Sequence, residues 1–303
     1  MTRTVLILGA SGRFGRACDT AFTAAGWQVH RFDRKRDSLR QMAMAADVIV
    51  NGWNPAYPDW ATQVPALHGQ VIEAAKVSGS TVILPGNVYV YGAGTPPPWS
   101  EASPHRAENP LGRIRRSMEA AYRAAGVRVI LLRAGDFIDT SASGNWFDAV
   151  MTAKLAKGRF IYPGNPEIPH AWAYLPDLAR AAVQLATRDD LDVFEEVPFP
   201  GHTLTGQAML AALNGVLARP AQLKPMAWWP LQLAAPVWPM GRCLLEMRYL
   251  WDTPHWLDGS RFGQLLPGFT QTPLPQVLAA ALAASLLLQD VHPDQPVAAA
   301  GAA

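Results

Sequence analysis

Residues Thr4 to Arg34 read TVLILGASGRFGRACDTAFTAAGWQVHRFDR. The first five residues, Thr4 to Leu8, are apolar or β-branched, which predicts a short strand buried on both faces of a sheet. A glycine-rich turn follows at once, and helical spacing then runs from Arg16 to Ala25. A second strand, Gln28 to Phe32, leads into Asp33. This order of strand, glycine turn, helix, strand and acidic residue is typical of a dinucleotide-binding βαβ unit.

The three glycines of the turn have separate roles in such a unit. Gly9 permits a sharp turn, Gly12 leaves room for the backbone to approach phosphate, and Gly15 lets the helix pack closely on the strand. The free N–H groups at the helix start then face an anion. The alternative is a glycine turn without a ligand. We expect a cofactor pyrophosphate here, held by Gly9, Ser11, Gly12, Arg13, Phe14 and Gly15.

Length and composition indicate a globular protein with one large core and a smaller second domain. The chain has 303 residues, of which 50% are hydrophobic and 17% charged. A net charge of +2 does not suggest a nucleic-acid partner. Two cysteines, Cys18 and Cys243, form no disulfide framework, which suits a reducing cytoplasm. We also expect no signal peptide, because the first strand begins almost at the start of the chain.

Two apolar stretches near the C-terminal end raise the question of membrane contact. Prolines interrupt Met226 to Met247, and Leu274 to Gln289 is too short to cross a bilayer. We therefore expect helices that cover a core or a pocket, and no membrane contact. The histidines in this half of the chain lack metal-ligand spacing, so we expect no metal site either.

Strands and helices alternate as far as Leu132, which predicts a parallel sheet with helices on both faces. This pattern indicates a doubly wound Rossmann-type domain formed by residues 1–139 and 171–193. A smaller, mostly helical lobe, residues 140–170 and 194–289, would cover the substrate. Residues 290–303 are rich in alanine and proline, and we expect them to form a flexible tail.

Five motifs, in order, resemble the extended or atypical short-chain dehydrogenase/reductase superfamily in its epimerase/dehydratase branch. They are GASGRFG (9–15), DVIVNGWN (47–54), NVYVYG (87–92), LRAGDF (132–137) and HAWAYLPDLARA (170–181). The resemblance covers nearly the whole chain. It implies that the loop Gly52, Trp53 and Asn54 contacts the cofactor. It also implies that Arg133, Ala134 and Gly135 lead into the nicotinamide pocket.

The catalytic positions depart from the pattern of that superfamily, which uses a Ser or Thr followed by Tyr-x-x-x-Lys. Asn87 takes the place of the Ser or Thr, Leu111 that of the tyrosine and Arg115 that of the lysine. Leucine cannot transfer protons, and arginine holds its proton too firmly to relay one. The usual chemistry therefore needs other groups, or it does not occur.

Two tyrosines could supply the missing proton donor. If Asn87 to Tyr91 is extended, then Asn87, Tyr89 and Tyr91 point to one face of the strand. Arg115 nearby would lower the pKa of a tyrosine there, so Tyr91 is the first candidate and Tyr89 the second. The alternatives are that both tyrosines only pack or bind substrate, and that Arg115 forms a solvated pair with Glu119.

The segment after the second strand is unusually short. Only residues 34–46 separate Asp33 from the next strand, whereas the superfamily usually fits a further strand there. We therefore expect a sheet that is one strand narrower on this side, with a more open adenine site.

The charges at this edge bear on the choice of cofactor. Asp33 favours NAD, because a carboxylate accepts hydrogen bonds from ribose hydroxyls and repels a 2′-phosphate. Arg13 and Arg34 to Arg36 favour NADP, because they could bind that phosphate. The balance of charge favours NADP over NAD, unless residues 34–36 form only a solvated basic loop.

Taken together, these features predict an NAD(P)-dependent oxidoreductase or epimerase-like enzyme with a non-standard active site. The substrate would be a small molecule, either apolar or aromatic, to suit the tryptophan-rich lobe, or a sugar nucleotide held by Arg242, Arg248 and Arg261. The alternative is a non-catalytic NAD(P)-binding regulator or assembly factor. The resemblance also implies a homodimer formed through the helices at 60–78 and 112–125.

Overall fold

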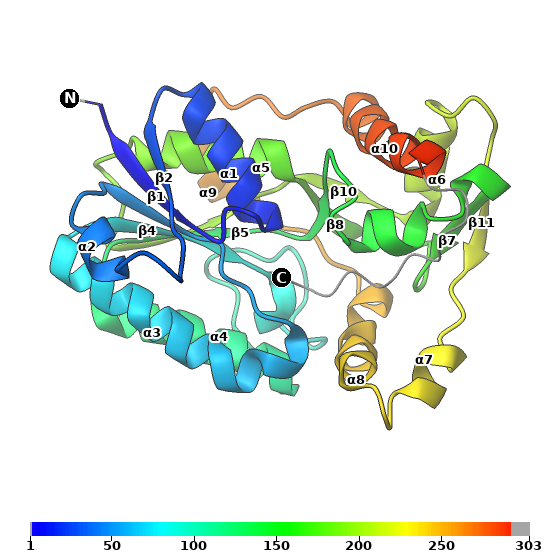
Figure 1. Cartoon of the computed structure of the whole chain (residues 1–303). Coiled ribbons are helices and arrows are strands. Elements are labelled where there is room, and N and C mark those ends of the chain that lie inside the picture. The colour runs from blue at the N-terminus through cyan, green and yellow to red at the C-terminus, as the bar shows by residue number, and fades with distance from the viewer. Residues whose placement is uncertain (1, 292–303) are drawn as a thin grey trace.

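The computed structural model describes residues 2–291 of the chain (Figure 1). The predicted tail, 290–303, lies outside the described residues except for its first two, which end α10 (Leu274–Val291). No helix within 2–291 is long and apolar enough to cross a membrane.

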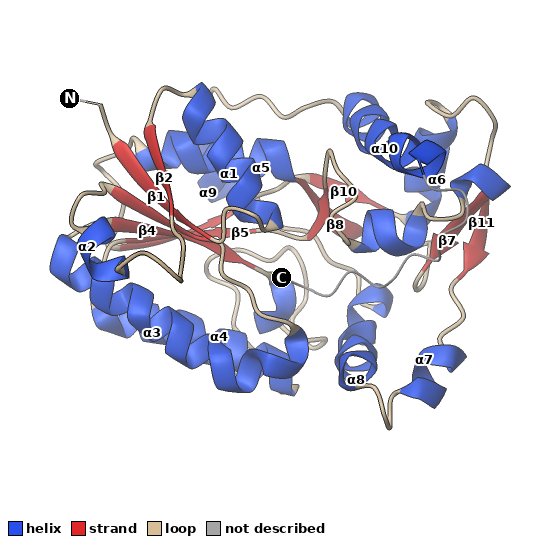
Figure 2. Ribbon diagram, viewed as in Figure 1, coloured by secondary structure: helices blue, strands red, loops and turns tan. Residues whose placement is uncertain are grey.

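A six-stranded parallel sheet lies at the centre of the larger part of the molecule (Figure 2). Its strand order is β2-β1-β3-β4-β5-β9. Val5 of β1 pairs with Val29 of β2 on one side and with Val48 of β3 on the other. This topology confirms the predicted Rossmann-type sheet. The strands are β1 (Thr4–Leu8), β2 (Gln28–Arg31), β3 (Val48–Asn51), β4 (Thr81–Gly86), β5 (Val129–Arg133) and β9 (Phe194–Pro198).

Helices cover both faces of this sheet, as the doubly wound prediction requires (Figure 1). One apolar core lies between the sheet and the side chains of α1, α5 and α9, and a second lies beneath α2, α3 and α4. The inner strands β1, β3, β4 and β5 are therefore buried on both sides, which explains their largely apolar sequences. The helices are α1 (Arg13–Ala24), α5 (Leu175–Ala186), α9 (Ser260–Leu265), α2 (Leu39–Ala43), α3 (Trp60–Ser78) and α4 (Pro110–Ala125).

The sheet ends at β2, as predicted from the short segment that follows it. Among residues 34–46, all of which the structure describes, only α2 is regular. Ser38 starts this helix by accepting a hydrogen bond from the Gln41 amide. The predicted loss of one edge strand is confirmed.

The smaller lobe contains sheets as well as helices, so the prediction of a mostly helical lobe is only partly right (Figure 2). One small sheet has the order β10-β8-β6, and the other pairs β11 with β7. These strands are too short to leave a periodic signal. The elements are β6 (Asp136–Ile138), β7 (Arg159–Tyr162), β8 (His170–Tyr174), β10 (His202–Leu204), β11 (Gln222–Pro225), α6 (Gly206–Asn214), α7 (Trp229–Ala234) and α8 (Pro239–Glu246).

The boundary between the two parts also differs from the one drawn from the sequence. Residues 194–289 were assigned to the lobe, but β9 pairs with β5 in the main sheet. Phe262 and Leu265 of α9 pack in the core beside α1 and α5. The chain thus returns to the main sheet after residue 193 and again near residue 260.

Candidate active site

The glycine turn forms a tight cradle where β1 meets α1. Gly9 has a φ of +72°, and its carbonyl accepts a hydrogen bond of 2.9 Å from the Gly12 amide. A Cβ on Gly15 would lie 2.1 Å from the Gly9 carbonyl oxygen, so helix and turn are in close contact. No side chain caps the start of α1. The first amides of the helix are thus left for an anion, and this geometry fits a dinucleotide pyrophosphate.

The end of β3 closes one side of the cradle. A Cβ on Gly52 would lie 2.8 Å from the Leu8 carbonyl oxygen and 3.3 Å from the Gly15 amide nitrogen. Trp53, which is 5% exposed, packs edge-on against Phe32. The structure therefore places Gly52 and Trp53 beside the glycine turn, and their contact with a cofactor stays a prediction.

Arg13 turns toward the lobe. Its guanidinium donates hydrogen bonds of 2.8 and 2.9 Å to the carbonyls of Ser143 and Gly144. Arg16 reinforces this contact through an ion pair of 2.6 Å with Asp139. These bonds tie the glycine turn to the segment after β6 and leave Arg13 engaged with two carbonyls.

The carboxylate of Asp33 is already partnered at the end of β2. It accepts hydrogen bonds from the Lys35 amide at 2.9 Å and from Arg36 Nε at 2.7 Å. The Lys35 amide, and then Arg36, hold the pKa of Asp33 below its usual value. Arg34 lies 5.0 Å above the ring of Trp53. The negative charge of Asp33 is thus balanced within its own loop, and the positive charge of Arg34 lies over Trp53.

The segment Asn87 to Tyr91 is not extended, contrary to the prediction. The Asn87 side chain accepts a hydrogen bond from the Tyr89 amide and starts a 3₁₀ helix, Val88–Val90. Such a turn sends Tyr89 and Tyr91 in different directions. The two tyrosines therefore lie in separate surroundings.

Tyr91 does not have the properties expected of the first-choice proton donor. Its ring is fully buried and stacks on Trp99 at 4.6 Å, and its hydroxyl donates to the Ser100 carbonyl. Burial raises the pKa of Tyr91, and the nearby Arg133 only offsets part of this rise. The expected lowering of its pKa is wrong.

Tyr89 forms a hydroxyl pair with Tyr57, a residue that the sequence did not point to. The two oxygens are 2.6 Å apart, and both side chains are partly exposed. Burial raises the pKa of Tyr89 well above its usual value, and Tyr57 and Asp136 raise it further, whereas Arg115 lowers it. Both hydroxyls therefore stay protonated at neutral pH and can donate a hydrogen bond.

Arg115 lies beneath this pair on α4, and its environment contradicts the solvated alternative. It is 7% exposed, its guanidinium lies 3.9 Å above the Trp60 ring, and it donates to the Asn54 side-chain oxygen. Burial lowers the pKa of Arg115. Leu111 is buried one turn earlier on the same helix. Arg115 and Asn54 thus join α4 to the loop after β3.

Arg133 is committed to an internal ion cluster. Its guanidinium is fully buried, lies 2.8 Å from Glu119 and 2.6 Å from Glu196, and also donates to the Asn87 carbonyl. Glu119 therefore pairs with Arg133 and not with Arg115. Beyond it, the Ala134 amide bonds to the Gly86 carbonyl, and a Cβ on Gly135 would lie 2.1 Å from the Ala171 carbonyl oxygen. Arg133 is thus enclosed in the protein, and the approach of Ala134 and Gly135 to a nicotinamide stays a prediction.

A carboxylate–imidazole pair that the sequence did not suggest completes the site. Asp136 Oδ2 lies 2.7 Å from His170 Nε2. His170 is the first residue of β8. The signal that could have found the pair is the position of Asp136 three residues beyond the end of β5, near the carboxyl ends of the strands, where parallel sheets place their ligands.

A hollow of about 460 Å³ lies elsewhere, between α3 and α4. Val64, His68 and Ile72 line it from α3, and Ile114 and Met118 from α4. These are the two helices through which the resemblance implies a dimer, and the homodimer remains a prediction.

Comparison with known proteins gives a fold and no close relative. No family model matches the chain, and no curated protein matches its sequence. Among solved structures, MoeE5 in complex with UDP-glucose and NAD is 16% identical, has a TM-score of 0.70, and covers 94% of this chain and 99% of its own. UDP-glucuronic acid 4-epimerase from Bacillus cereus in complex with NAD is 14% identical, with a TM-score of 0.72 and coverage of 97% and 99%.

A third match has a different activity. The GalE-like L-threonine dehydrogenase from Cupriavidus necator is 17% identical, with a TM-score of 0.71 and coverage of 93% and 99%. The chain therefore has the same fold as these solved structures, which include an epimerase and a dehydrogenase. At these identities the likeness shows the fold alone, and the activity has to be argued from the site.

Proposed function

We propose that this protein is an NAD(P)-dependent oxidoreductase or epimerase-like enzyme that acts on a carbonyl or alcohol carbon of a small molecule. One observation carries the proposal. Beyond the carboxyl ends of β1, β3 and β4, the structure has both a glycine cradle that fits a pyrophosphate and the Tyr57–Tyr89 hydroxyl pair. A bound nicotinamide would supply or accept the hydride. The side chains of this chain would orient the substrate and handle one proton.

Tyr89 is the proposed proton donor, with Tyr57 behind it. A raised pKa makes Tyr89 a weaker acid but keeps it protonated at neutral pH, so that a proton is present to donate. An alkoxide that forms on the substrate is more basic than a tyrosinate, so the proton still moves toward the substrate. The arrangement thus favours carbonyl reduction over alcohol oxidation. The Tyr57 hydroxyl, 2.6 Å away, can hold the Tyr89 hydroxyl in place, and the charge of Arg115 favours the tyrosinate that remains.

We further propose a preference for NADP over NAD. Arg36 and the Lys35 amide neutralise Asp33, which removes much of the repulsion toward a 2′-phosphate. Arg34 lies beside them, above the Trp53 ring, and would pair with that phosphate. Arg13 contributes less than the sequence suggested, because it bonds to the lobe.

The second candidate is a non-catalytic NAD(P)-binding protein of the same fold. The buried Leu111 at the usual tyrosine position favours it, as does the raised pKa of both remaining tyrosines. Such a protein would bind the cofactor as tightly as an enzyme does but would not convert a substrate.

Two measurements test the proposal. NADH and NADPH are titrated, with energy transfer from the eleven tryptophans to the reduced nicotinamide as readout. We expect NADPH to bind more tightly, and Arg34→Glu to reverse the preference. Failure of both cofactors to bind would refute the proposal.

Carbonyl substrates are then screened with the preferred cofactor. Tyr89→Phe is expected to lower kcat by about 10²-fold or more, the usual size of an acid–base contribution, with cofactor affinity unchanged. Tyr91→Phe is the matched control, because the Tyr91 hydroxyl bonds only to a carbonyl outside the site. An equal loss in both variants would contradict the role of Tyr89, and binding without any turnover would favour the second candidate.

A further inference from the structure

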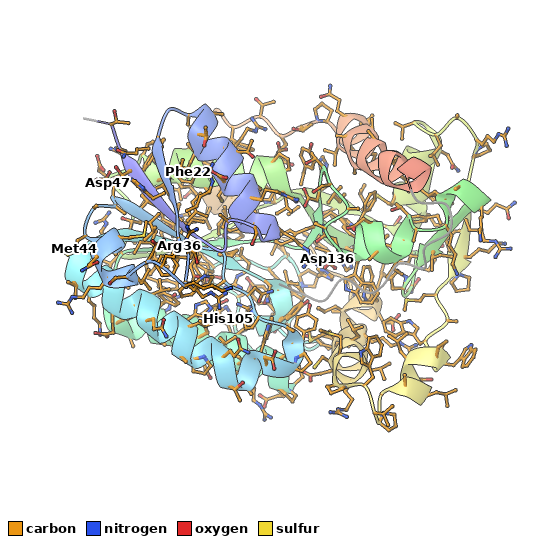
Figure 3. The ribbon with its side chains drawn as sticks, in the orientation of Figure 1. Phe22, Arg36, Met44, Asp47, His105 and Asp136 are labelled. Carbon is orange, nitrogen blue, oxygen red and sulfur yellow. The ribbon has the colours of Figure 1, made fainter. Side chains whose placement is uncertain are left out.

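The Asp136–His170 pair presents its carboxylate outward and its imidazole inward. The Asp136 side chain is 26% exposed and that of His170 is 3% exposed. Asp136 Oδ2 takes the bond of 2.7 Å to His170 Nε2, and the other oxygen remains for a partner outside the protein. Figure 3 shows Asp136 between the six-stranded sheet and the smaller lobe.

Aromatic rings hold the imidazole in place. His170 stacks on Trp251 with centroids 4.4 Å apart and planes at 10°, and Trp172 lies 4.9 Å away. His255 meets the edge of the His170 ring at 4.3 Å and is itself fixed by a bond from Nδ1 to the Thr253 carbonyl. A carboxylate anchored on a ring that cannot turn is oriented before any ligand arrives.

The surroundings of the carboxylate are aromatic. Asp136 pairs with Trp172 across β6 and β8. Burial raises the pKa of Tyr57, Tyr89 and Tyr162, and the charge of Asp136 raises it further. Tyr162 in turn packs on Trp251 at 5.8 Å. Arg115 also acts on Tyr57 and Tyr89, but its guanidinium lies over the Trp60 ring and bonds to Asn54. The carboxylate of Asp136 stands among aromatic faces and suits a cation with an apolar body, because both the charge and the rings attract it.

The cations that could have received a diphosphate are engaged elsewhere. Arg261 forms two bonds with Glu195, at 2.8 and 2.7 Å. Arg242 donates to the carbonyls of Ala235 and Pro236, and Arg248 lies above the Trp228 ring. A sugar nucleotide would therefore bring its negative charge toward Asp136 without an arginine from this set to balance it.

We propose that the substrate of this site is a non-phosphorylated amine with an apolar or aromatic body, whose ammonium group binds Asp136. This inference rests on the proposed function, because it names the substrate class of the same site. His170 acts as a positioning residue that holds the carboxylate. The reacting carbon would lie within reach of the Tyr57–Tyr89 pair on the same molecule.

The test measures binding by calorimetry, with and without NADPH, and does not depend on turnover. The probes are 2-phenylethylamine, its neutral counterpart 2-phenylethanol, and UDP-glucose. We expect the amine to bind at least tenfold more tightly than the alcohol, as a charge-assisted hydrogen bond implies. Binding of UDP-glucose in preference to the amine, or binding of no probe at millimolar concentration, would overturn the inference.

Three variants locate the effect. Asp136→Asn should lower amine affinity at least tenfold and leave the affinity for 2-phenylethanol unchanged. His170→Gln, whose amide can still donate to the carboxylate, should retain more amine affinity than His170→Leu. Asp190→Asn, at a surface carboxylate paired with Arg188, is the control and should change neither. Unchanged amine binding in Asp136→Asn would refute the site.

The cofactor titration separates the two proposals. If Asp136→Asn binds NADPH normally but no longer binds the amine, both proposals are supported. If the intact protein binds the amine but neither nicotinamide cofactor, the amine site stands and the proposed oxidoreductase fails. If the intact protein binds a nicotinamide cofactor but not the amine, the proposed oxidoreductase stands and the amine site fails.

Discussion

At the scale of single residues, buried charge decides which side chains are available for chemistry. Arg133 and Arg115 are both buried arginines near the site, yet only Arg133 has carboxylate partners. Arg133 is therefore part of the framework. Arg115 keeps a positive field beside Tyr57 and Tyr89, because its partners are the Trp60 ring, the Asn54 oxygen and a methionine sulfur.

Removal of the Arg133 charge should be strongly destabilising. Arg133→Leu leaves Glu119 and Glu196 buried without their main partner, and breaking such a pair costs about 3–5 kcal/mol. The measurement is urea denaturation at neutral pH. Lys76→Met, which removes an exposed pair with Glu73, is the control and should change the free energy of unfolding by less than about 1 kcal/mol. A similar decrease in the free energy of unfolding in both variants would show that the Arg133 cluster does not stabilise the fold.

The residue scale is also where sequence reasoning fails most. The pairs Tyr57–Tyr89 and Asp136–His170 join residues 32 and 34 positions apart, and no local pattern marks them. The choice of Tyr91 assumed an extended segment, and one side-chain bond from Asn87 was enough to overturn it.

At the scale of elements, the sequence predicted what local chemistry controls. The glycine turn and the helix after it follow from residue spacing, and the narrower sheet follows from the short segment after β2. The structure has the turn and the helix, and its sheet ends at β2. The 3₁₀ helix Val88–Val90 and the pairing of β7 with β11 depend on contacts between distant segments. The strand β9 was assigned to the wrong part for the same reason, since only its partner β5 shows where it belongs.

Two glycine substitutions separate a required glycine from a tolerated one. In Gly15→Ala the new methyl group would lie 2.1 Å from the Gly9 carbonyl oxygen. We expect a loss of at least about 1–3 kcal/mol in stability, as in other overpacked sites, and weakened cofactor binding. Gly69→Ala, inside α3, meets nothing within 4 Å and should stabilise the helix by about 0.5–1 kcal/mol. Thermal denaturation of both variants checks this, and a neutral Gly15→Ala would contradict the tight turn.

At the scale of the whole molecule, three histidines tie stability to pH. Burial, and then Arg115, lower the pKa of His68 to about 3 from 6.5. Burial also lowers the pKa of His202, and that of His255 falls well below its usual value. The unfolded chain therefore takes up protons that the folded chain does not, so the free energy of unfolding should fall as pH drops below about 6.5.

Chemical denaturation at pH 7.5, 6.5 and 5.5 measures this dependence. His68→Gln should reduce the slope between pH 6.5 and 5.5, because one buried neutral histidine is removed. Gln28→Ala, at an exposed residue of β2 that does not titrate, is the control and should leave the slope unchanged. Stability that rises as the pH falls through this range would contradict the burial of these rings.

The narrow sheet has one more consequence. The outer side of β2 offers backbone N–H and C=O groups without a neighbouring strand, which is how chains add to one another during aggregation. The strand is only four residues long, and its last residue, Arg31, is exposed and paired with Asp19. Shortness and charge are common means of blocking an open edge. Because one strand is lost, the short and polar β2 is the element that resists pairing with a strand of another chain.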